Sequence, residues 1–358
     1  NRVALALLAL CCVAADWKTA GPGWQYEFPR DHHAHGDFKT EWWYFTGNLG
    51  DAAGRLFGFQ LTFFRHGIRP PAQRDPEMSR FVVSDLKFAH FTVTDVGKKR
   101  FHFQQKASRG AFGEAGFDEG HRVAWIDGWN LRITREGAFH LQAEAKEAAI
   151  DLRLKSVKAP VIHGESGVSQ KASSAGHASH YYSLTRLGSI GHLRLGTETF
   201  QVHGESWFDH EWATNQLAPG QIGWNWLSTQ FDDGTELMLY QMRREDGTAD
   251  PSSSGTFVAN DGSRTHLEST SFRMTPTRYW KSGVSGATYP VGLRVEIPNR
   301  NLQFTVRAAL ENQELALQPL AYWEGAIEVD GVREGRAIEG RGYLELTGYA
   351  GPLRALQR

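Results

Sequence analysis

One pattern of residues occurs twice in this chain, and it limits the folds that the chain can adopt. Trp42 to Leu49 is followed by a turn and by Phe59 to Leu61, and Trp224 to Phe231 is followed in the same way by Tyr240 to Met242. Taken at every second residue, each copy places two aromatic side chains, a hydroxyl and a carboxamide on one face of a strand. These residues are Trp42, Tyr44, Thr46 and Asn48 in the first copy and Trp224, Trp226, Ser228 and Gln230 in the second.

A second repeat closes each half of the chain. Gly191 to Leu195 leads to Val202 to Trp207, and Gly325 to Val329 leads to Ile338 to Tyr343. An opening hairpin and a closing hairpin, each present twice, predict two homologous domains.

We place these domains at residues 41–212 and 213–358, after an N-terminal extension at 16–40. The first domain is the longer one. Its extra residues at 65–80 and 164–180 are expected to form surface loops, which are more often functional or mobile than inert.

Between the repeats, apolar and polar residues alternate over short runs that end in turn residues. Leu293, Val295 and Ile297, for example, precede a turn that is followed by Leu302 and Phe304. Helical periodicity is nearly absent, so the pattern predicts an antiparallel all-β protein. Because closure removes exposed sheet edges, we expect two tandem antiparallel β-barrels of about eight strands each, a size that can hold one small ligand.

Charge and composition narrow the choice of partner. Lys and Arg total 39 and Asp and Glu total 40, so the chain has no basic surplus for nucleic acid, which we exclude as a partner. The 12 Trp, 10 Tyr and 21 Phe residues suit short strands with large aromatic contact surfaces. Together these numbers favour a hydrophobic small molecule as the ligand.

The first residues resemble a targeting segment. Arg2 precedes an apolar run from Val3 to Ala15 that is too short to span a bilayer, which predicts a signal peptide at 1–15 and a secreted or periplasmic protein. Cys11 and Cys12, the two cysteines of the chain, lie inside this run, so we expect no disulfide in the mature protein. Leu10 before Cys11 argues against a lipid anchor. No later segment approaches the length of a transmembrane span.

Residues 203–212 hold the densest set of reactive groups. Alternation places one set of side chains on one face of this strand and another set on the other. A carboxylic acid whose pKa is raised by burial can act as a general acid, so we take Glu205, Asp209 and Glu211, with His210, as candidate catalytic residues. The alternative is an interdomain linker whose polar residues hydrogen-bond the joint. The first face carries His203, Glu205, Trp207, Asp209 and Glu211, and the second carries Ser206, Phe208, His210 and Trp212.

The aromatic residues of the repeats form the candidate ligand site. They would line an apolar cavity, with tyrosine hydroxyls as polar contacts, or they would form a barrel core and a domain contact. The sequence does not say which face of each strand points inward. The candidate ligand-binding residues are Glu41, Trp42, Trp43, Tyr44, His203, Trp207, Trp212, Trp224, Trp226, Gln230 and Tyr240.

Other polar motifs give weaker signals. Asp31 to His35 contains three histidines, which we interpret as surface residues, and we expect neither a metal nor another cofactor. The tetrapeptide His-Gly-Glu-Ser occurs at His163 to Ser166 and at His203 to Ser206. Neither copy completes a G-x-S-x-G nucleophile elbow, so a serine hydrolase is disfavoured.

Three motifs together resemble a known family. Glu41 to Leu49, Trp207 to Trp212 and Gly223 to Trp226 are similar to segments of the AttH and carotenoid 1,2-hydratase (CrtC) family of two-domain lipocalin-like (calycin) proteins. The resemblance covers nearly the whole mature chain. It implies a pair of lipocalin-like barrels with a pocket for a lipid, an isoprenoid or a polyketide.

The resemblance also implies a chemistry. In the hydratases of the family, a protonated carboxylic acid in an apolar pocket protonates an alkene, and water captures the cation. His210 and Trp212 match the family's His-x-Trp pair. The chain departs from the family downstream, where a protonating Asp would be expected: the strand reads Tyr240 to Met242, and Asp232 and Asp233 lie in a turn.

The sequence thus leaves three hypotheses for the function. The first is a secreted protein that binds a lipid or isoprenoid and is linked to its metabolism. The second is an enzyme on such a ligand, a hydratase, isomerase or hydrolase. The third is a structural module whose filled barrels present a surface to a partner protein. The residues leave the ligand's identity and the oligomeric state open.

Overall fold

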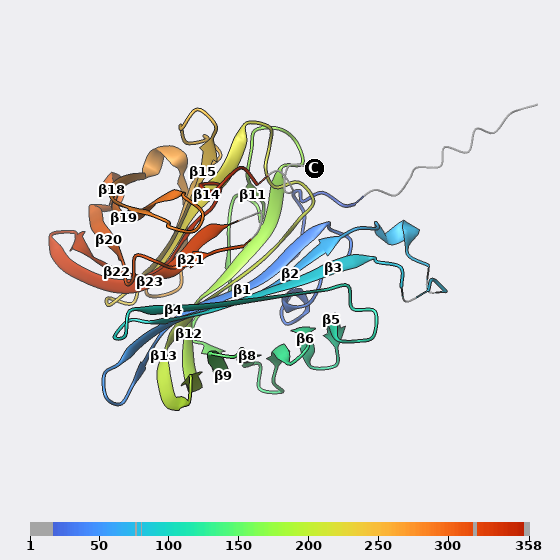
Figure 1. Ribbon diagram of the computed structural model, residues 1–358. Helices are drawn as coiled ribbons and strands as arrows, with labels where there is room; N and C mark the ends of the chain where they lie inside the picture. Colours follow the sequence, from blue (N-terminus) through green and yellow to red (C-terminus); the bar gives the residue numbers. More distant parts are fainter. Residues whose placement is uncertain (1–16, 76, 80, 318–320, 354–358) are drawn as a thin grey trace, which may run out of the picture.

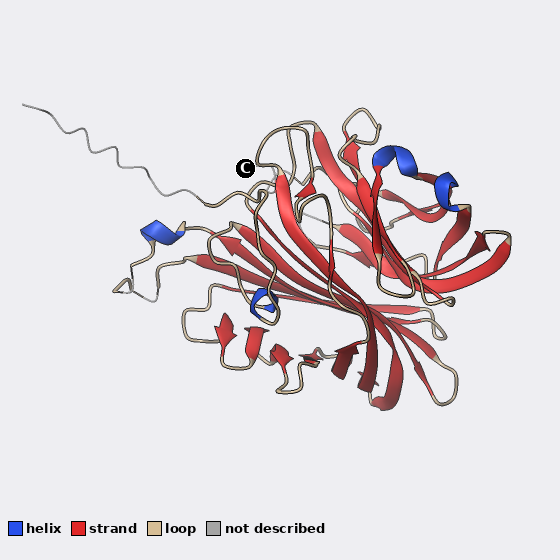
Figure 2. Cartoon of the chain, turned by 180° about the vertical axis from the view of Figure 1, so that it is seen from behind, coloured by secondary structure: helices blue, strands red, loops and turns tan. Residues whose placement is uncertain are grey.

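A computed structural model describes residues 17–75, 77–79, 81–317 and 321–353. The predicted signal peptide at 1–15, with Cys11 and Cys12, lies outside the described residues. Strands dominate the described chain (Figure 2), which confirms the all-β prediction. The described helices are short 3-10 turns, namely η1 (Arg30–His32), η2 (Pro71–Gln73), η3 (Ser269–Ser271) and η4 (Pro298–Arg300). None of the described helices is long and apolar enough to cross a membrane.

The first sheet is antiparallel and has 13 strands in the order β4-β3-β2-β1-β13-β12-β9-β8-β7-β6-β5, with β10 and β11 paired to β12. Its strands are β1 (Thr40–Asp51), β2 (Leu56–Gly67), β3 (Asp85–Asp95), β4 (Arg100–Ser108), β5 (Ala115–Glu119), β6 (Arg122–Ile126), β7 (Trp129–Ile133), β8 (Phe139–Glu144), β9 (Ala148–Ser156), β10 (Val161–Ile162), β11 (Ser169–Gln170), β12 (Ala178–Leu195) and β13 (Glu198–Ala213).

The second sheet is antiparallel and has 10 strands in the order β17-β16-β15-β14-β23-β22-β20-β19-β18, with β21 paired to β22. Its strands are β14 (Gln221–Phe231), β15 (Glu236–Arg244), β16 (Ser254–Val258), β17 (Arg264–Glu268), β18 (Arg273–Lys281), β19 (Thr288–Ile297), β20 (Leu302–Ala308), β21 (Glu314–Leu315), β22 (Tyr322–Arg333) and β23 (Arg336–Leu346).

The internal repeat of the sequence is an internal repeat of topology. The central strands of the first sheet run β2-β1-β13-β12, and those of the second run β15-β14-β23-β22. Each order places the opening hairpin of one repeat beside its closing hairpin. The two sheets therefore share a plan, which confirms two tandem barrel-like units related by duplication.

Each sheet curls around its own apolar core. In Figure 1 the short strands β5 to β8 lie across from β1 to β4. Ring contacts join these walls: Phe45 of β1 meets Phe139 of β8 at 5.4 Å, and Phe91 of β3 meets Trp129 of β7 at 5.7 Å between ring centroids. In the second sheet, Phe231 of β14 meets Phe304 of β20 at 5.4 Å. Burial of these faces supplies the main driving force for folding.

A third apolar cluster lies between the two sheets. It is formed by the outer faces of the central strands, so these strands are buried on both sides, one side in a barrel and the other in the joint between barrels. On β1, Trp43 and Phe45 point into the first barrel, whereas Tyr44 points into the joint. The cluster consists of Tyr44, Tyr181, Trp207, Leu217, Trp226, Met238, Tyr240, Met242, Ala326, Tyr343 and Leu353.

Two segments expected outside the barrels are packed against them. In the N-terminal segment, Trp24, Tyr26 and Phe28 contact the first core. The expected surface loop at 164–180 is a wrong prediction in part, because Ser169 and Lys171 are buried. Their polar atoms are satisfied by groups of the joint, which offsets the cost of burying them.

Candidate active site

The two faces that repeat in the sequence meet each other across the joint. The ring of Tyr44 on β1 lies edge-on to that of Trp226 on β14, with centroids 5.3 Å apart at 84°. Trp42 and Trp224 flank this pair and are half-buried. The predicted aromatic face therefore forms the contact between domains rather than the interior of either barrel.

The carboxamide of each repeat donates hydrogen bonds to the backbone of the other domain. Nδ2 of Asn48 donates a hydrogen bond to the carbonyl of Gly342 on the opposite closing strand at 3.2 Å. Nε2 of Gln230 donates to the carbonyl of Ser206, the matching residue of the first domain, at 2.9 Å, and to that of Thr185 at 2.8 Å. The repeat thus specifies the relative position of the two barrels through buried side chain to backbone bonds.

Asp209 is buried in this joint, next to Tyr44 in the strand register. Its carboxyl accepts hydrogen bonds from the Tyr181 hydroxyl at 2.5 Å, from Trp207 Nε1 at 2.5 Å and from the Ser183 hydroxyl. Burial raises the pKa of Asp209 to about 7, against the opposing effect of these three donors. A carboxyl with this pKa is available both as an acid and as a base near neutral pH.

Two further acids lie in the second half of the joint. Glu324 of β22, which is buried, and Glu345 of β23, which is half-buried, are direct cross-strand partners. Trp224 Nε1 donates to Glu345 Oε2 at 2.8 Å. Burial raises the pKa of Glu345 to about 7, with a further contribution from Glu211 and Asp209. Burial and the charge of Glu345 raise the pKa of Glu324 well above its usual range.

Tyrosine hydroxyls lie beside these acids. Tyr44 Oη, Tyr343 Oη and Glu324 Oε1 are buried, and none forms a hydrogen bond of good geometry with another described residue. Burial, together with Glu324, Glu345 and Asp209, raises the pKa of Tyr44, so its hydroxyl stays neutral and remains a donor. Unsatisfied buried polar atoms are costly, which indicates a place for water or for a polar group of a ligand.

A hydrogen-bonded chain runs from Asp209 into the second domain. The hydroxyl of Ser183 also contacts His163 Nε2 at 2.6 Å, and His163 Nδ1 contacts Thr256 Oγ1 of β16 at 2.8 Å. Burial lowers the pKa of His163 well below its usual value, so the imidazole is neutral. Sequence reasoning missed His163 and Ser183 as site residues, and the repeated His-Gly-Glu-Ser motif was the one signal that pointed to His163.

Glu211 follows Asp209 on the same face of β13 and pairs with a lysine from the expected surface loop. Lys171 Nζ lies 2.9 Å from Glu211 Oε1 and 4.1 Å from the centroid of the Tyr240 ring. Burial lowers the pKa of Lys171, but the charge of Glu211 outweighs it and the pKa is raised. The lysine is therefore a buried cation beside two aromatic rings.

The remaining predicted residues of this face lie at the rim. Glu205 is half-exposed and forms a two-oxygen ion pair with Arg186, at 2.6 and 2.7 Å, while Arg186 Nε binds Glu236 of the second domain at 2.7 Å. His203 is exposed. Glu205 and His203 are thus separated from the buried acids, and Glu205 contributes to a bridge between domains.

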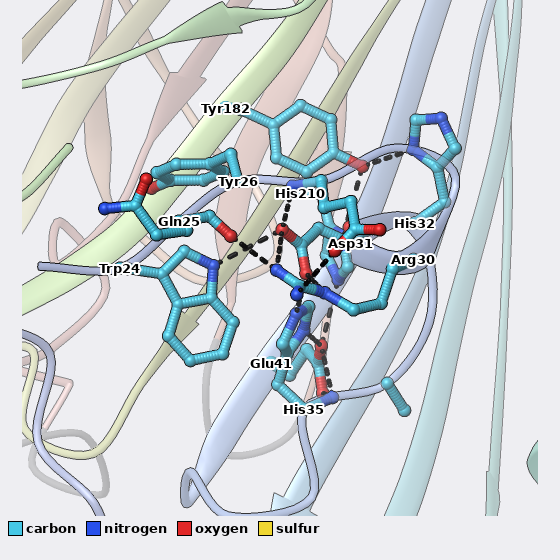
Figure 3. A network of polar contacts seen from close by, with 12 residues as sticks. Trp24, Gln25, Tyr26, Arg30, Asp31, His32, His35, Glu41, Tyr182 and His210 are labelled. Atoms are coloured by element: carbon cyan, nitrogen blue, oxygen red, sulfur yellow. Dashed lines mark hydrogen bonds and ion pairs between the residues drawn. The ribbon is translucent and has the colours of Figure 1, made fainter.

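His210 lies on the opposite face of β13 from Asp209 and points into the first barrel. Figure 3 shows it in a polar network with the N-terminal segment. Nε2 of His210 lies 3.0 Å from Glu41 Oε1, and its Nδ1 lies 2.9 Å from the carbonyl of Asp31. Asp209 and His210 therefore belong to two separate clusters, and the structure does not bring them together for a joint proton transfer.

Glu41 and His35 are central to this second cluster. Glu41 accepts bonds from His35 Nδ1 at 2.7 Å and from Arg65 Nε at 3.1 Å. Burial would raise the pKa of Glu41, but His35, His210 and Arg65 lower it. Burial lowers the pKa of His35, but Glu41 and Asp31 outweigh it and the pKa is raised. The interpretation of these histidines as surface residues is wrong for His35, whose side chain is 8% exposed.

The donor set of this cluster fits a metal poorly. Ligand atoms of His35, Glu41 and His210 lie within 4.8 Å of one another. However, Glu41 already pairs with Arg65 Nε at 3.1 Å and with His35 Nδ1 at 2.7 Å, and the ring of His35 stacks on Trp212 at 3.6 Å. A cation at this place would compete with those charges, so the cluster is a buried ion-pair network that fixes the N-terminal segment.

Two hollows occur elsewhere on the first unit. One, of about 330 Å³, is lined by Phe91, Phe101, Phe103 and the turn between β8 and β9. The other, of about 530 Å³, is lined by residues of the N-terminal segment, including Trp24 and Asp31. Neither is lined by the buried acids of the joint. The candidate site at the joint is therefore assigned from its side chains and their unsatisfied polar atoms, and not from either hollow.

The two antiparallel sheets curl and share one repeated plan, and a polar and aromatic joint lies between them. These features define a two-domain β-barrel protein. The profile of the AttH-like family matches residues 19–349. A crystal structure from Nitrosomonas europaea described as AttH is 32% identical, covers 93% of this chain and 99% of its own, and has a TM-score of 0.82. This chain belongs to the AttH-like family, as the sequence motifs predicted.

Relatives with named activities are more distant. Dehydratase asqC of Emericella nidulans is 22% identical over 273 residues, which cover 72% of this chain and 75% of that protein. The crystal structure of kievitone hydratase from Nectria haematococca is 12% identical, covers 91% of this chain and 93% of its own, and has a TM-score of 0.71. The second similarity shows a shared fold.

Proposed function

We propose that this protein is an enzyme that adds water to, or removes water from, a hydrophobic small molecule held at the joint between its barrels. Asp209 carries the proposal: it is a fully buried carboxyl with a pKa of about 7, set among aromatic rings. The names of two relatives, a dehydratase and a hydratase, support the same class of reaction.

The chemistry follows from the surroundings of Asp209. Protonation of an alkene leaves a cationic carbon, which electron-rich ring faces stabilise in a water-poor site. Tyr44, Tyr181 and Trp226 provide such rings within the joint. A neutral carboxyl is required for the first step, and burial keeps Asp209 protonated up to near neutral pH. The strand from Tyr240 to Met242 lacks the Asp that the family resemblance implies, and the proposal assigns the role of acid to Asp209 on β13.

The test is incubation of the purified chain with a panel of prenylated phenols, terpenoid alkenes and the matching tertiary alcohols in ¹⁸O-labelled water. Liquid chromatography with mass spectrometry would detect gain or loss of one water. We expect conversion of at least one panel member, and a loss of about 10²–10⁴-fold in rate in Asp209→Asn. Asp151→Asn, an exposed carboxyl on β9, is the matched control and should keep the full rate.

The same experiment separates the enzyme from a carrier of lipid or isoprenoid, which the aromatic joint also supports. Native mass spectrometry of the protein from its own host would reveal a bound ligand. A ligand that binds with unchanged mass in both wild type and Asp209→Asn would contradict the enzyme and favour the carrier. Absence of both binding and conversion across the panel would contradict both.

A further inference from the structure

The internal repeat gives Asp209 a counterpart in the second domain. Tyr44 pairs with Asp209 across β1 and β13, and Trp226, which matches Tyr44 in the repeat, pairs with Glu345 across β14 and β23. Glu345 and Asp209 are thus equivalent positions on the two closing strands. Both face the same joint, since each contributes to the electrostatic potential at Tyr44.

Glu345 differs from Asp209 in having a second acid beside it. Glu324 is its direct partner on β22. Side chains directly opposite in an antiparallel pair have Cβ atoms about 4.5–5.5 Å apart, close enough for two carboxyls to compete for one proton. Two carboxylates at this separation, one buried and one half-buried, repel each other when both are ionised, so the pair holds a proton between them near neutral pH.

Independent atoms indicate that this pair faces a ligand position. Tyr44 Oη, Tyr343 Oη and Glu324 Oε1 are buried and form no hydrogen bond of good geometry with another described residue, although the hydroxyls of Tyr44 and Tyr322 lie close enough to Glu324 to favour its ionised form. Tyr44 and Tyr343 are 7% and 1% exposed. Two donors and an acceptor whose hydrogen bonds are not satisfied with good geometry in one region can bind a water molecule, or a hydroxyl group of a substrate.

We propose that Glu345, with Glu324 as its proton-sharing partner, is the general base that activates this water while Asp209 protonates the substrate. The proposal rests on the proposed function and adds a second catalytic group to it. Its substrate class is an apolar molecule with an alkene, or a hydroxyl on the carbon that becomes cationic. Acid and base would thus come from equivalent strands of the two duplicated domains.

The reaction balances with these groups alone. In hydration, the alkene π pair takes the proton of Asp209 and forms a C–H bond. The water oxygen forms a C–O bond to the cationic carbon, and the Glu345 carboxylate takes the proton that water loses. Asp209 is then ionised and Glu345 protonated, and one proton passes back through the joint before the next turnover. Dehydration is the same sequence reversed.

Several titratable groups face the Glu324–Glu345 pair and set its proton affinity. The like charges of Glu211 and Asp209 favour the protonated pair, and the Trp224 N–H favours ionised Glu345. Hydroxyls near Glu324 favour its ionised form. The groups concerned are Tyr44 on β1, His90 on β3 through Tyr322, Asp209 and Glu211 on β13, Trp224 on β14, Tyr322 on β22 and Tyr343 on β23.

The first test needs no substrate. The full chain is labelled with ¹³C at the glutamate carboxyl, and its NMR shifts are followed with pH in wild type, Glu345→Gln, Glu324→Gln and Glu328→Gln. We expect a glutamate that titrates near neutral pH to be lost in Glu345→Gln. In that variant Glu324 should titrate at least about one pH unit lower than in wild type. Glu328, which is exposed on β22 with Glu324, is the control.

Independent titration of Glu324 and Glu345, with no mutual effect, would overturn the shared proton. Glutamine at position 345 keeps an acceptor oxygen for Trp224 Nε1, so we expect the variant to fold. Urea unfolding of each variant checks this.

The second test uses the substrate found in the labelled-water panel. A bell-shaped dependence of kcat/KM on pH is expected, since the base must be ionised and the acid protonated. Glu345→Gln should remove the acidic limb and lower the rate about 10²–10⁴-fold, and Asp209→Asn should remove the alkaline limb.

The outcomes separate the two proposals. If Asp209→Asn is inactive but Glu345→Gln keeps the wild-type rate and profile, the base is misassigned while the proposed function stands. If no panel member is converted, the proposed function fails, and the NMR titration still decides whether the pair shares a proton.

Discussion

Asp209→Asn should make this protein more stable at alkaline pH and change how its stability responds to pH. The substitution removes one buried ionisable group and keeps nearly the same shape. In the folded protein the pKa of Asp209 is about 7, against an ordinary value of 3.8 in the unfolded chain. Between these two values the folded protein holds a proton that the unfolded chain has released.

The size of the effect follows from this difference of about three pKa units. Each unit corresponds to about 1.4 kcal/mol, so ionisation of Asp209 costs about 4 kcal/mol of unfolding free energy. The folded state binds more protons than the unfolded state from about pH 4 to about pH 7, so the stability of the wild type falls as pH rises through this window. Above about pH 7 the loss is complete.

Asparagine does not ionise, so the variant escapes this cost. It keeps one acceptor for Tyr181 or Ser183 but replaces the other oxygen by a donor, which costs about 1–3 kcal/mol at every pH. The variant should therefore be less stable than wild type at about pH 4 and more stable at about pH 8.

Urea unfolding followed by tryptophan fluorescence, repeated from about pH 4 to about pH 8, measures the difference. We expect the free-energy difference between the two proteins to move by about 4 kcal/mol in favour of the variant across this range. Asp151→Asn, with an exposed carboxyl whose pKa is lowered, should give a constant difference above about pH 5. A constant difference for Asp209→Asn as well would refute the argument, because Asp209 would then ionise as it does in water.

Three further outcomes follow from other parts of the structure. Glu236→Gln removes the carboxylate that pairs with Arg186 Nε and should lower the free energy of unfolding in urea by about 3–5 kcal/mol. The exposed control Glu328→Gln should show no such loss. His35→Gln should lower the melting temperature more at about pH 6 than at about pH 9. The reason is that the stability contributed by protonated His35 is lost as the pH rises through its raised pKa. Equal losses at both pH values would exclude the charged form of His35. Gly342→Ala places a methyl group 1.8 Å from the carbonyl oxygen of Ser228 on β14 and should lower the free energy of unfolding in urea by about 1–3 kcal/mol. An unchanged free energy of unfolding would show that the two strands can move apart without cost.

The position of Asp209 shows how far sequence reasoning reached toward the site. Alternation along β13 predicted that Asp209, Glu211 and Trp207 share a face, and the structure places Asp209 and Trp207 together in the joint. The acids of the second domain were missed, because Glu345 lies within an ordinary alternating strand. The signal that could have found it was the repeat itself, extended from Tyr44 and Asp209 to Trp226 and Glu345.

The segments that the sequence placed wrongly have a common cause. Lys171 and His35 belong to stretches rich in Gly, Ser or His, which usually indicate exposed loops. In the folded chain each side chain is paired with a carboxylate of a strand. Lys171 pairs with Glu211 of β13, and His35 pairs with Glu41 of β1. A local pattern carries no information about such partners.

The sequence by itself determined the fold class and the duplication, since both depend on properties that are local to a strand. Period-two alternation defines strands and faces, and a repeated face needs no knowledge of what lies opposite. Only the tertiary structure decided that the face of Tyr44 and Trp226 lies between the barrels and that the face of Trp43 lies inside one. Both faces are apolar because both are buried, and burial alone does not reveal which neighbour covers a side chain. For the same reason, the meeting of Asp209 with the Glu324–Glu345 pair required the two sheets to be docked.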